Sequence, residues 1–243
     1  MIELILLGIV VGVLSGFFGI GGGTILIPIL LFLGIPTKDA IGISVVQMVF
    51  SSVFGSYLNN KKGTLDVPMV VVIGLGGFVG ALLSGYITSS FSDFTLELIF
   101  LSFSLFALLR MFFKPKESKG QKDVSKVVLF LIGVPIGTLS MTIGVGGSII
   151  LVPILVGFLH VDLKRATSAG LFFVVFSSVA GFISHMQVGD LDYQSGIIIG
   201  LASMIGVYVG VHLKDRVTPI LQKRLLVGFY MLIVLYIVKR IFF

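Results

Sequence analysis

The chain contains no cysteine and no tryptophan, and only 12% of its 243 residues are charged. The absence of cysteine excludes disulfides, thiol catalysis and cysteine-ligated metals. A soluble domain carries roughly a quarter of its residues as charges, so this chain has about half the usual share. Because 56% of the residues are hydrophobic and the mean hydropathy is +1.16, the composition predicts a membrane protein.

Chemical motifs are also scarce. The apolar segments contain no paired carboxylates, the sequence has no HExxH motif and no Walker lysine loop, and Ser168 and His185 have no nucleophile motif around them. We therefore predict no enzyme, no metal and no cofactor. The net charge of +6 comes without a basic helix bearing interleaved aromatics, so we predict no nucleic-acid partner. The first residues lack a basic n-region, and we expect them to be a structural segment.

Charges and turn residues divide the chain into ten apolar segments, five in each half. This pattern predicts an all-α polytopic membrane protein embedded in membrane lipids. We predict an N-terminal transmembrane repeat over 1–113, a cytoplasmic linker over 114–126 and a C-terminal repeat over 127–243. The expected segments are approximately 2–16, 20–34, 41–58, 68–90, 94–113, 126–140, 144–160, 167–185, 194–212 and 219–242.

The two halves repeat one another. Residues 19–30 read GIGGGTILIPIL, and residues 144–155 read GVGGSIILVPIL, with eight of the twelve positions identical at an offset of 125. Residues 50–66 (FSSVFGSYLNNKKGTLD) and 176–192 (FSSVAGFISHMQVGDLD) match in the same way at an offset of 126. Glycine-interrupted apolar segments at matching positions of two repeats are typical of the substrate site of secondary transporters.

The segments around each glycine cluster are short, about 15 residues or roughly 22 Å of helix against a ~30 Å hydrocarbon core. They fit a broken or re-entrant hairpin, and a full crossing stays open. A hairpin plus three spans in each half would invert the second repeat. With the linker inside, fourteen of the 17 lysines and arginines then face the cytoplasm, as the positive-inside rule requires. We predict inverted repeats in the plasma (inner) membrane with both termini outside.

The glycine clusters are the first candidate site. Glycine accepts positive φ and lets a ligand approach the backbone, and a helix starting after it presents free N–H groups to an anion. The alternative is that glycine only permits tight helix packing. We expect packing for the stripes of Gly8, Gly12 and Gly16, Gly76 and Gly80, and Gly206 and Gly210, one of which could also join a homodimer. The candidate substrate-binding residues are Gly21, Gly22, Gly23, Thr24, Gly146, Gly147 and Ser148.

Polar residues on the segment after each cluster form a second candidate set. Hydroxyls and amides that face a bundle interior can replace water around an oxyanion, although serine in a membrane helix often bonds only its own backbone. His185 stands where the first half has Asn59, and it could couple transport to protons or be merely solvated. The candidates are Ser44, Gln47, Ser51, Ser52 and Asn59 in the first half, and Ser177, Ser178 and His185 in the second.

The two glycine-proline motifs, the small-residue segment after each and the glycine-aspartate loops resemble the TauE/SafE-type sulfite exporter family, also called toluene sulfonate uptake permeases. The resemblance covers essentially the whole chain. It implies a carrier of sulfite, sulfonate, sulfoacetate or thiosulfate, driven by a proton or sodium gradient. Its motif glycines correspond to both clusters, but Ser148 replaces a glycine. The alternative is a channel, or a membrane assembly protein without transport activity.

Overall fold

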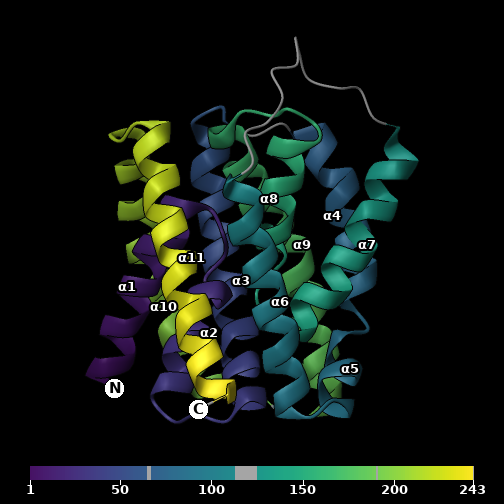
Figure 1. Cartoon of the computed structure of the whole chain (residues 1–243), viewed down its shortest axis with the longest axis vertical. Helices are drawn as coiled ribbons and strands as arrows, with labels where there is room; N and C mark the ends of the chain where they lie inside the picture. The colour runs from purple at the N-terminus through teal and green to yellow at the C-terminus, as the bar shows by residue number, and fades with distance from the viewer. Residues whose placement is uncertain (65–66, 113–124, 190, 243) are drawn as a thin grey trace.

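The computed structural model describes residues 1–64, 67–112, 125–189 and 191–242. Within these ranges it contains eleven α-helices and no strand (Figure 1). Each half begins with a 17-residue helix and a 10-residue helix separated by a glycine break. The helices are α1 (Ile2–Phe18), α2 (Gly23–Phe32), α3 (Thr37–Lys61), α4 (Val67–Ala81), α5 (Ser84–Ser90), α6 (Asp93–Phe112), α7 (Lys126–Thr142), α8 (Ser148–Gly157), α9 (Leu163–Val188), α10 (Tyr193–Asp215) and α11 (Pro219–Phe242).

The helices are apolar around most of their circumference, as expected for helices that lie in lipid or in a buried interior. Among the described residues, the helices α3, α9, α10 and α11 are long and apolar enough to cross a membrane, and the bent pair α4–α5 would make a fifth span. The four helices beside the glycine breaks are apolar but shorter. The chain is therefore an all-α, multi-pass membrane protein, as the composition predicts.

Both termini lie at one end of the bundle, and α3 begins at this end as well (Figure 1). The pair α1–α2 thus returns to the end where it started. The pair α7–α8 starts from the opposite end of the bundle (Figure 1). Most of the predicted linker lies outside the described residues, as does the whole of residues 65–66.

One predicted segment is divided. The sequence predicts one apolar segment over approximately 68–90, and the structure bends by 41° within it, between α4 and α5. At the bend, the Leu83 N–H donates to the Gly80 carbonyl, three residues back, which tightens the turn. The Ser84 hydroxyl donates a hydrogen bond to the Ala81 carbonyl at 2.7 Å. A serine hydroxyl that competes for a backbone carbonyl is a known cause of helix bending.

Helices of the two halves pack closely against each other at glycine residues. A Cβ on Gly12 of α1 would stand 2.1 Å from the Ser203 carbonyl oxygen of α10, and one on Gly206 would stand 2.1 Å from the Ile9 oxygen. The same contact joins α7 to α4, where a Cβ on Gly137 would stand 2.1 Å from the Gly77 oxygen. The stripes expected to pack therefore do pack, each against the other half. These stripes are covered within the chain and are not available to join a homodimer.

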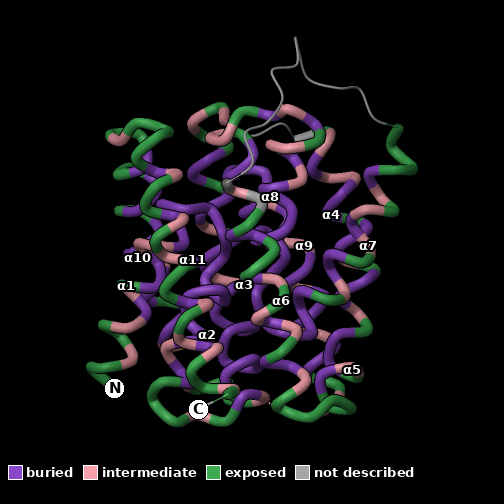
Figure 2. Tube along the Cα trace, viewed as in Figure 1, coloured by how far each residue is buried: buried purple, intermediate pink, exposed green. Residues whose placement is uncertain are grey.

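Buried residues fill the middle of the bundle, while exposed residues follow its two ends and outer faces (Figure 2). Residues 17–28 and 140–153 are buried throughout. Each range contains one glycine break and most of the short helix that follows it. The fold therefore places both candidate clusters in its interior.

Candidate functional site

The two glycine breaks lie against each other. A Cβ on Gly23 would stand 1.9 Å from the carbonyl oxygen of Gly144. A Cβ on Gly21 would stand 3.6 Å from both the Ser148 hydroxyl and the Val145 carbonyl oxygen. Segments separated by more than a hundred residues thus meet at one buried point.

The glycines of the breaks serve two purposes. Gly19, Gly21, Gly144, Gly146 and Gly147 have positive φ, between 66° and 91°, which residues with a side chain rarely adopt. The other two glycines of the first cluster are helical, with φ of −65° at Gly22 and with Gly23 opening α2. At these two glycines the missing side chain allows a close approach by other parts of the protein.

Each break delivers the start of a short helix to this point. The Gly22 carbonyl accepts the N–H of Leu26, and the Gly147 carbonyl accepts the N–H of Leu151, so α2 and α8 begin immediately after the breaks. The first N–H groups of an α-helix have no partner within the helix, and its start carries partial positive charge. Among the described residues, no backbone carbonyl accepts from Gly23, Thr24 or Ser148.

The two candidate hydroxyls on these helix starts differ. Thr24 donates back to the Ile20 carbonyl at 3.2 Å, within its own turn. The Ser148 hydroxyl is fully buried and has no hydrogen-bond partner among the described residues. Ser148 is therefore the side chain of the two that is free to donate to a ligand.

Two of the candidate serines hold the second break in place. The Ser44 hydroxyl donates to the Gly144 carbonyl at 2.8 Å, and the Ser177 hydroxyl donates to the Gly146 carbonyl at 2.8 Å. Both carbonyls belong to glycines with positive φ, outside any helix. These bonds satisfy polar backbone that no helix can pair.

The other candidate serines make weaker and more local contacts. Ser51 is 3.5 Å from the Met48 carbonyl of its own helix. Ser178 is 3.4 Å from the Val175 carbonyl of its own helix. Ser52 and Ser178 face one another across α3 and α9 at 3.5 Å. Self-bonding of this kind is the alternative role that serine has in membrane helices.

Gln47 covers the start of α2. A Cβ on Gly22 would stand 2.0 Å from the Gln47 Oε1, which has no hydrogen-bond partner among the described residues. The Gln47 Nε2 donates to the Ser203 hydroxyl at 3.1 Å. A polar side chain thus lies where a ligand of this helix start would bind.

The second half has an aromatic ring in the equivalent place. Phe173 stands 126 positions after Gln47, and a Cβ on Gly147 would stand 2.5 Å from its ring. The same ring would lie 2.4 Å from a Cβ on Gly77, the counterpart of Ser203 at the same offset. The start of α2 is therefore lined by polar groups and the start of α8 by an apolar ring. Comparing the two repeats position by position reveals this difference from the sequence.

Ser148 departs from the glycine pattern for a packing reason. In the first half, Gly23 faces the hydroxyl of Ser44, which would be 2.5 Å from a Cβ on Gly23. In the second half, Ser148 faces Gly170, on which a Cβ would stand 3.1 Å from the Ser148 Cβ. Gly170 stands 126 positions after Ser44 and is its counterpart. In the first half the serine is therefore on α3 and the glycine on α2, whereas in the second half the serine is on α8 and the glycine on α9.

Asn59 and His185 lie away from the breaks and from each other. Asn59 is near the end of α3, and its carbonyl accepts from Thr64 at 3.1 Å, which in turn bonds Ser168 near the start of α9 at 2.9 Å. His185 is near the other end of α9, roughly 25 Å from Ser168 at the helical rise of about 1.5 Å per residue. The same separation keeps Ser168 and His185 from acting as a pair.

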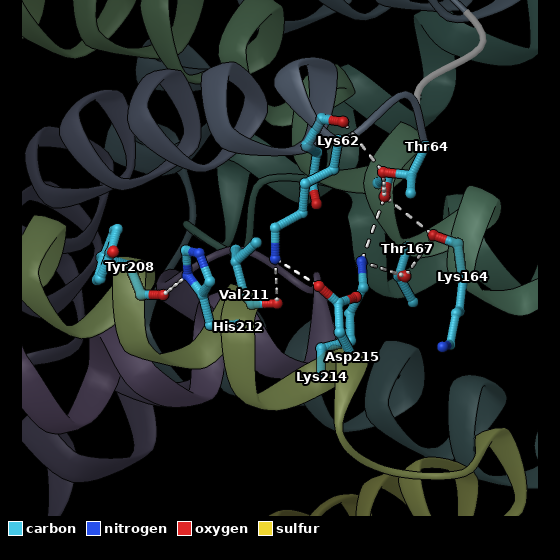
Figure 3. A network of polar contacts seen from close by, with 11 residues as sticks. Lys62, Thr64, Lys164, Thr167, Tyr208, Val211, His212, Lys214 and Asp215 are labelled. Carbon is cyan, nitrogen blue, oxygen red and sulfur yellow. Dashed lines mark hydrogen bonds and ion pairs between the residues drawn. The ribbon is translucent and has the colours of Figure 1, made fainter.

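A polar network that the sequence did not indicate lies where α3, α9 and α10 meet (Figure 3). At its centre, Lys214 is only 1% exposed and donates to the hydroxyls of Thr167 and Ser168 at 3.3 and 3.2 Å. The predicted segment ended at residue 212, which placed Lys214 in a cytoplasmic loop. The helix continues to Asp215 and carries the lysine into the interior.

A cleft opens at the end of the bundle that holds the termini. Its volume is about 490 Å³, and Leu4, Pro36, Asp39 and Asp192 are among the residues that line it. Ile43, the residue before Ser44, is part of its wall. The cleft therefore reaches within one residue of the serine that holds the second break.

Comparison with known proteins matches this chain to membrane transporters. The family model described as sulfite exporter TauE/SafE matches residues 4–237. The chain is 27% identical to the probable membrane transporter protein YdhB of Bacillus subtilis, over 90% of this chain and 93% of that protein. It is 25% identical to the probable membrane transporter protein MJ0441 of Methanocaldococcus jannaschii, over 89% and 87%. A shorter match is to the sulfite exporter TauE/SafE family protein 5 of Arabidopsis thaliana, with 36% identity. It covers 31% of this chain and 17% of that protein. No solved structure matches the chain significantly.

Proposed function

Because the chain belongs to the sulfite exporter TauE/SafE family, we propose that it is a secondary transporter of small sulfur-containing anions, of the sulfite, sulfonate, sulfoacetate or thiosulfate class. The observation that carries this proposal is the meeting of the two glycine breaks. There, two helix starts lie in a buried interior, and their first N–H groups have no backbone partner within the described ranges. Such helix starts bind anions, and in low dielectric their partial charges act strongly.

The anion binds between the breaks when the residues that cover them move aside. Backbone N–H groups of the two clusters, Gly21 to Thr24 and Gly146 to Ser148, hold its oxygens. The Ser148 hydroxyl, which has no partner among the described residues, donates a further bond. The Gln47 amide, now against Gly22, turns its Nε2 to the anion, while Ser44 and Ser177 hold the second break open.

Transport proceeds by alternating access of two inverted repeats in the plasma membrane, with both termini outside. The equal helix lengths of the two hairpins and their start from opposite ends of the bundle (Figure 1) support this arrangement. Ser51, Ser52, Ser178 and Asn59 line the route on either side of the breaks. An ion gradient drives the cycle, with His185 as the group that exchanges a coupling proton, or with sodium in its place.

The test is the melting temperature of the detergent-purified protein with sulfite, thiosulfate, sulfoacetate, sulfate and chloride. An anion that binds only the native state raises this temperature by mass action. We expect a rise with a sulfur anion in the unaltered protein and a much smaller rise in Ser148→Ala. Ser104→Ala is the matched control, because the Ser104 hydroxyl is also fully buried and has no hydrogen-bond partner in the described part of the chain, but lies on α6.

Each result has a distinct meaning. A rise that Ser148→Ala loses and Ser104→Ala keeps supports the site between the breaks. A rise that both variants keep supports sulfur-anion binding but removes Ser148 from the site. No rise with any sulfur anion contradicts the proposal and favours a channel or an assembly protein whose glycines serve packing alone.

A further inference from the structure

Lys214 presents a buried ammonium group to two hydroxyls and to no described carboxylate. Its Nζ donates to Thr167 and Ser168 at 3.3 and 3.2 Å, and Ser168 also contacts the Thr64 hydroxyl at 2.9 Å. The side chains come from α9, α10 and the residues after α3, and they converge on one point (Figure 3). An ammonium group has three protons to donate, so the two hydroxyls leave one unused.

The charged groups around Lys214 are engaged with other partners. The groups that act on it are Asp215, Lys62, Lys164 and Asp162. Asp215 forms an ion pair with Lys62, which also donates to the Val211 carbonyl. Asp162 accepts the backbone N–H of Lys164 at 2.9 Å at the start of α9. The two carboxylates are thus committed, and the two lysines add to the positive potential.

A buried ammonium group that touches no carboxylate is unfavourable, because the more distant charges of Asp215 and Asp162 repay its desolvation only in part. We propose that the Lys214 ammonium group, held in place by the hydroxyls of Thr167 and Ser168, which themselves donate to the Lys164 carbonyl, is an anion-binding site at the end of the bundle opposite the termini. Here the transported anion is held before or after it occupies the glycine breaks. That the ligand is the transported anion rests on the proposed function, whereas the site itself rests on the geometry around Lys214.

The lysine site adjoins the first glycine break. A Cβ on Gly19 would stand 2.5 Å from the Thr167 carbonyl oxygen and 2.7 Å from its Cβ. A Cβ on Gly170, on the next turn of α9, would stand 3.2 Å from the Gly19 carbonyl oxygen. The residue that bonds Lys214 therefore also contacts the break, and an anion that leaves the lysine meets the break next.

The opposite mouth of the protein has no equivalent cation at the matching position. Thr88 stands 126 positions before Lys214, and its hydroxyl donates to the carbonyls of Ser84 and Thr142, both at 2.8 Å. The two ends of the bundle therefore differ, because one has a buried lysine where the other has a threonine. In the predicted orientation, the lysine mouth faces the cytoplasm.

The experiment measures anion affinity in Lys214→Met by titrating sulfite, thiosulfate and chloride against the purified protein. Arg216→Gln is the matched control, because it removes one positive charge from an exposed position two residues further on. Charge-assisted hydrogen bonds to the lysine predict a loss of affinity of roughly ten- to a hundredfold in Lys214→Met, with the control close to the unaltered protein. In buffer without these anions, we expect Lys214→Met to melt at or above the temperature of the unaltered protein, because a buried unpaired charge is gone.

The outcomes separate the two proposals. Unchanged affinity in Lys214→Met overturns the lysine site and leaves the transporter proposal intact. Equal binding of chloride and sulfite, both lost in Lys214→Met, supports the site but contradicts the sulfur specificity. Stabilisation by phosphatidylglycerol with no effect of free anions overturns the site as part of the substrate route. If Lys214→Met does not fold, the pair Thr167→Val with Ser168→Ala takes its place, and unchanged affinity in that variant likewise overturns the proposal.

Discussion

Gly23 lies directly against the carbonyl oxygen of Gly144, which a Cβ on Gly23 would approach to 1.9 Å. The two residues belong to different repeats, and Ser44 donates to the same carbonyl at 2.8 Å. Neither break can change its backbone conformation without disturbing the other. A rearrangement that opens one helix start therefore also moves the second, which is compatible with the alternating access that we propose.

Gly23→Ala should destabilise the protein. The added methyl group meets a backbone carbonyl, which cannot turn away as a side chain could, and overpacking of this kind costs about 1–3 kcal/mol. We expect a lower melting temperature in detergent. Gly228→Ala is the control, since a Cβ there would have no described atom outside its own helix within 4 Å. Equal melting temperatures in both variants would contradict the contact between the breaks.

The exchange of serine and glycine between the repeats predicts a compensating pair. Gly170→Ser should destabilise by about 1–3 kcal/mol, because its side chain meets Ser148 and Val152. Adding Ser148→Gly recreates the arrangement of Gly23 and Ser44 and should restore most of the loss. Melting temperatures of the two single variants and the double variant give the interaction energy as a double-mutant cycle. Simple additivity would show that the two positions do not pack as described.

Arg240 should stabilise the end of the bundle that holds the termini. Its Nε lies 3.1 Å from the Glu97 Oε1, and its Nη1 donates to the Leu31 carbonyl at 2.9 Å. Arg240→Met leaves Glu97, which is only 8% exposed, with the Thr37 hydroxyl as its one remaining hydrogen-bond partner among the residues that the structure describes. We expect a loss of about 1–3 kcal/mol, partly recovered by adding Glu97→Gln. Lys239→Met, at an exposed neighbouring position, should melt like the unaltered protein.

The orientation can be tested directly because the chain has no cysteine of its own. Ser90→Cys and Lys61→Cys each place one thiol at an exposed position, and the two lie at opposite ends of the bundle, beside the ends of α5 and α3. In intact cells, a membrane-impermeant maleimide should label Ser90→Cys and spare Lys61→Cys until the cells are opened. The reverse labelling would place the termini in the cytoplasm.

Local sequence signals predict the fold well because the membrane leaves few alternatives to helices. The last segment was predicted over 219–242, which is also the extent of α11. The first cluster is less well predicted. The helix expected after the glycines begins within the cluster, at Gly23, because Gly19 and Gly21 have positive φ whereas Gly22 and Gly23 are helical. The bend between α4 and α5 lies beside Ser84 and Gly85, a serine-glycine pair that can bend a helix but that also occurs in helices of this chain that stay unbroken.

The candidate site is predicted less completely, because its composition depends on contacts between distant segments. The glycine clusters and Ser44 meet at one point, but no local pattern places Gln47 over Gly22. Lys214 was missed for a related reason. A lysine near a helix end resembles a loop charge, and only the position of Thr167 and Ser168 on another helix shows that it is buried.

The packing of α1 on α10 and of α7 on α4 has a consequence for biosynthesis. While the chain is being made, the glycine face of α1 has no partner until α10 emerges, close to the end of translation. The first half is therefore inserted into the bilayer while the glycine face of α1 is still exposed. This face is covered only when α10 of the second half packs against it. If the gene is split at the linker, the two halves should be stable when they are expressed together, and each should be degraded when it is expressed alone.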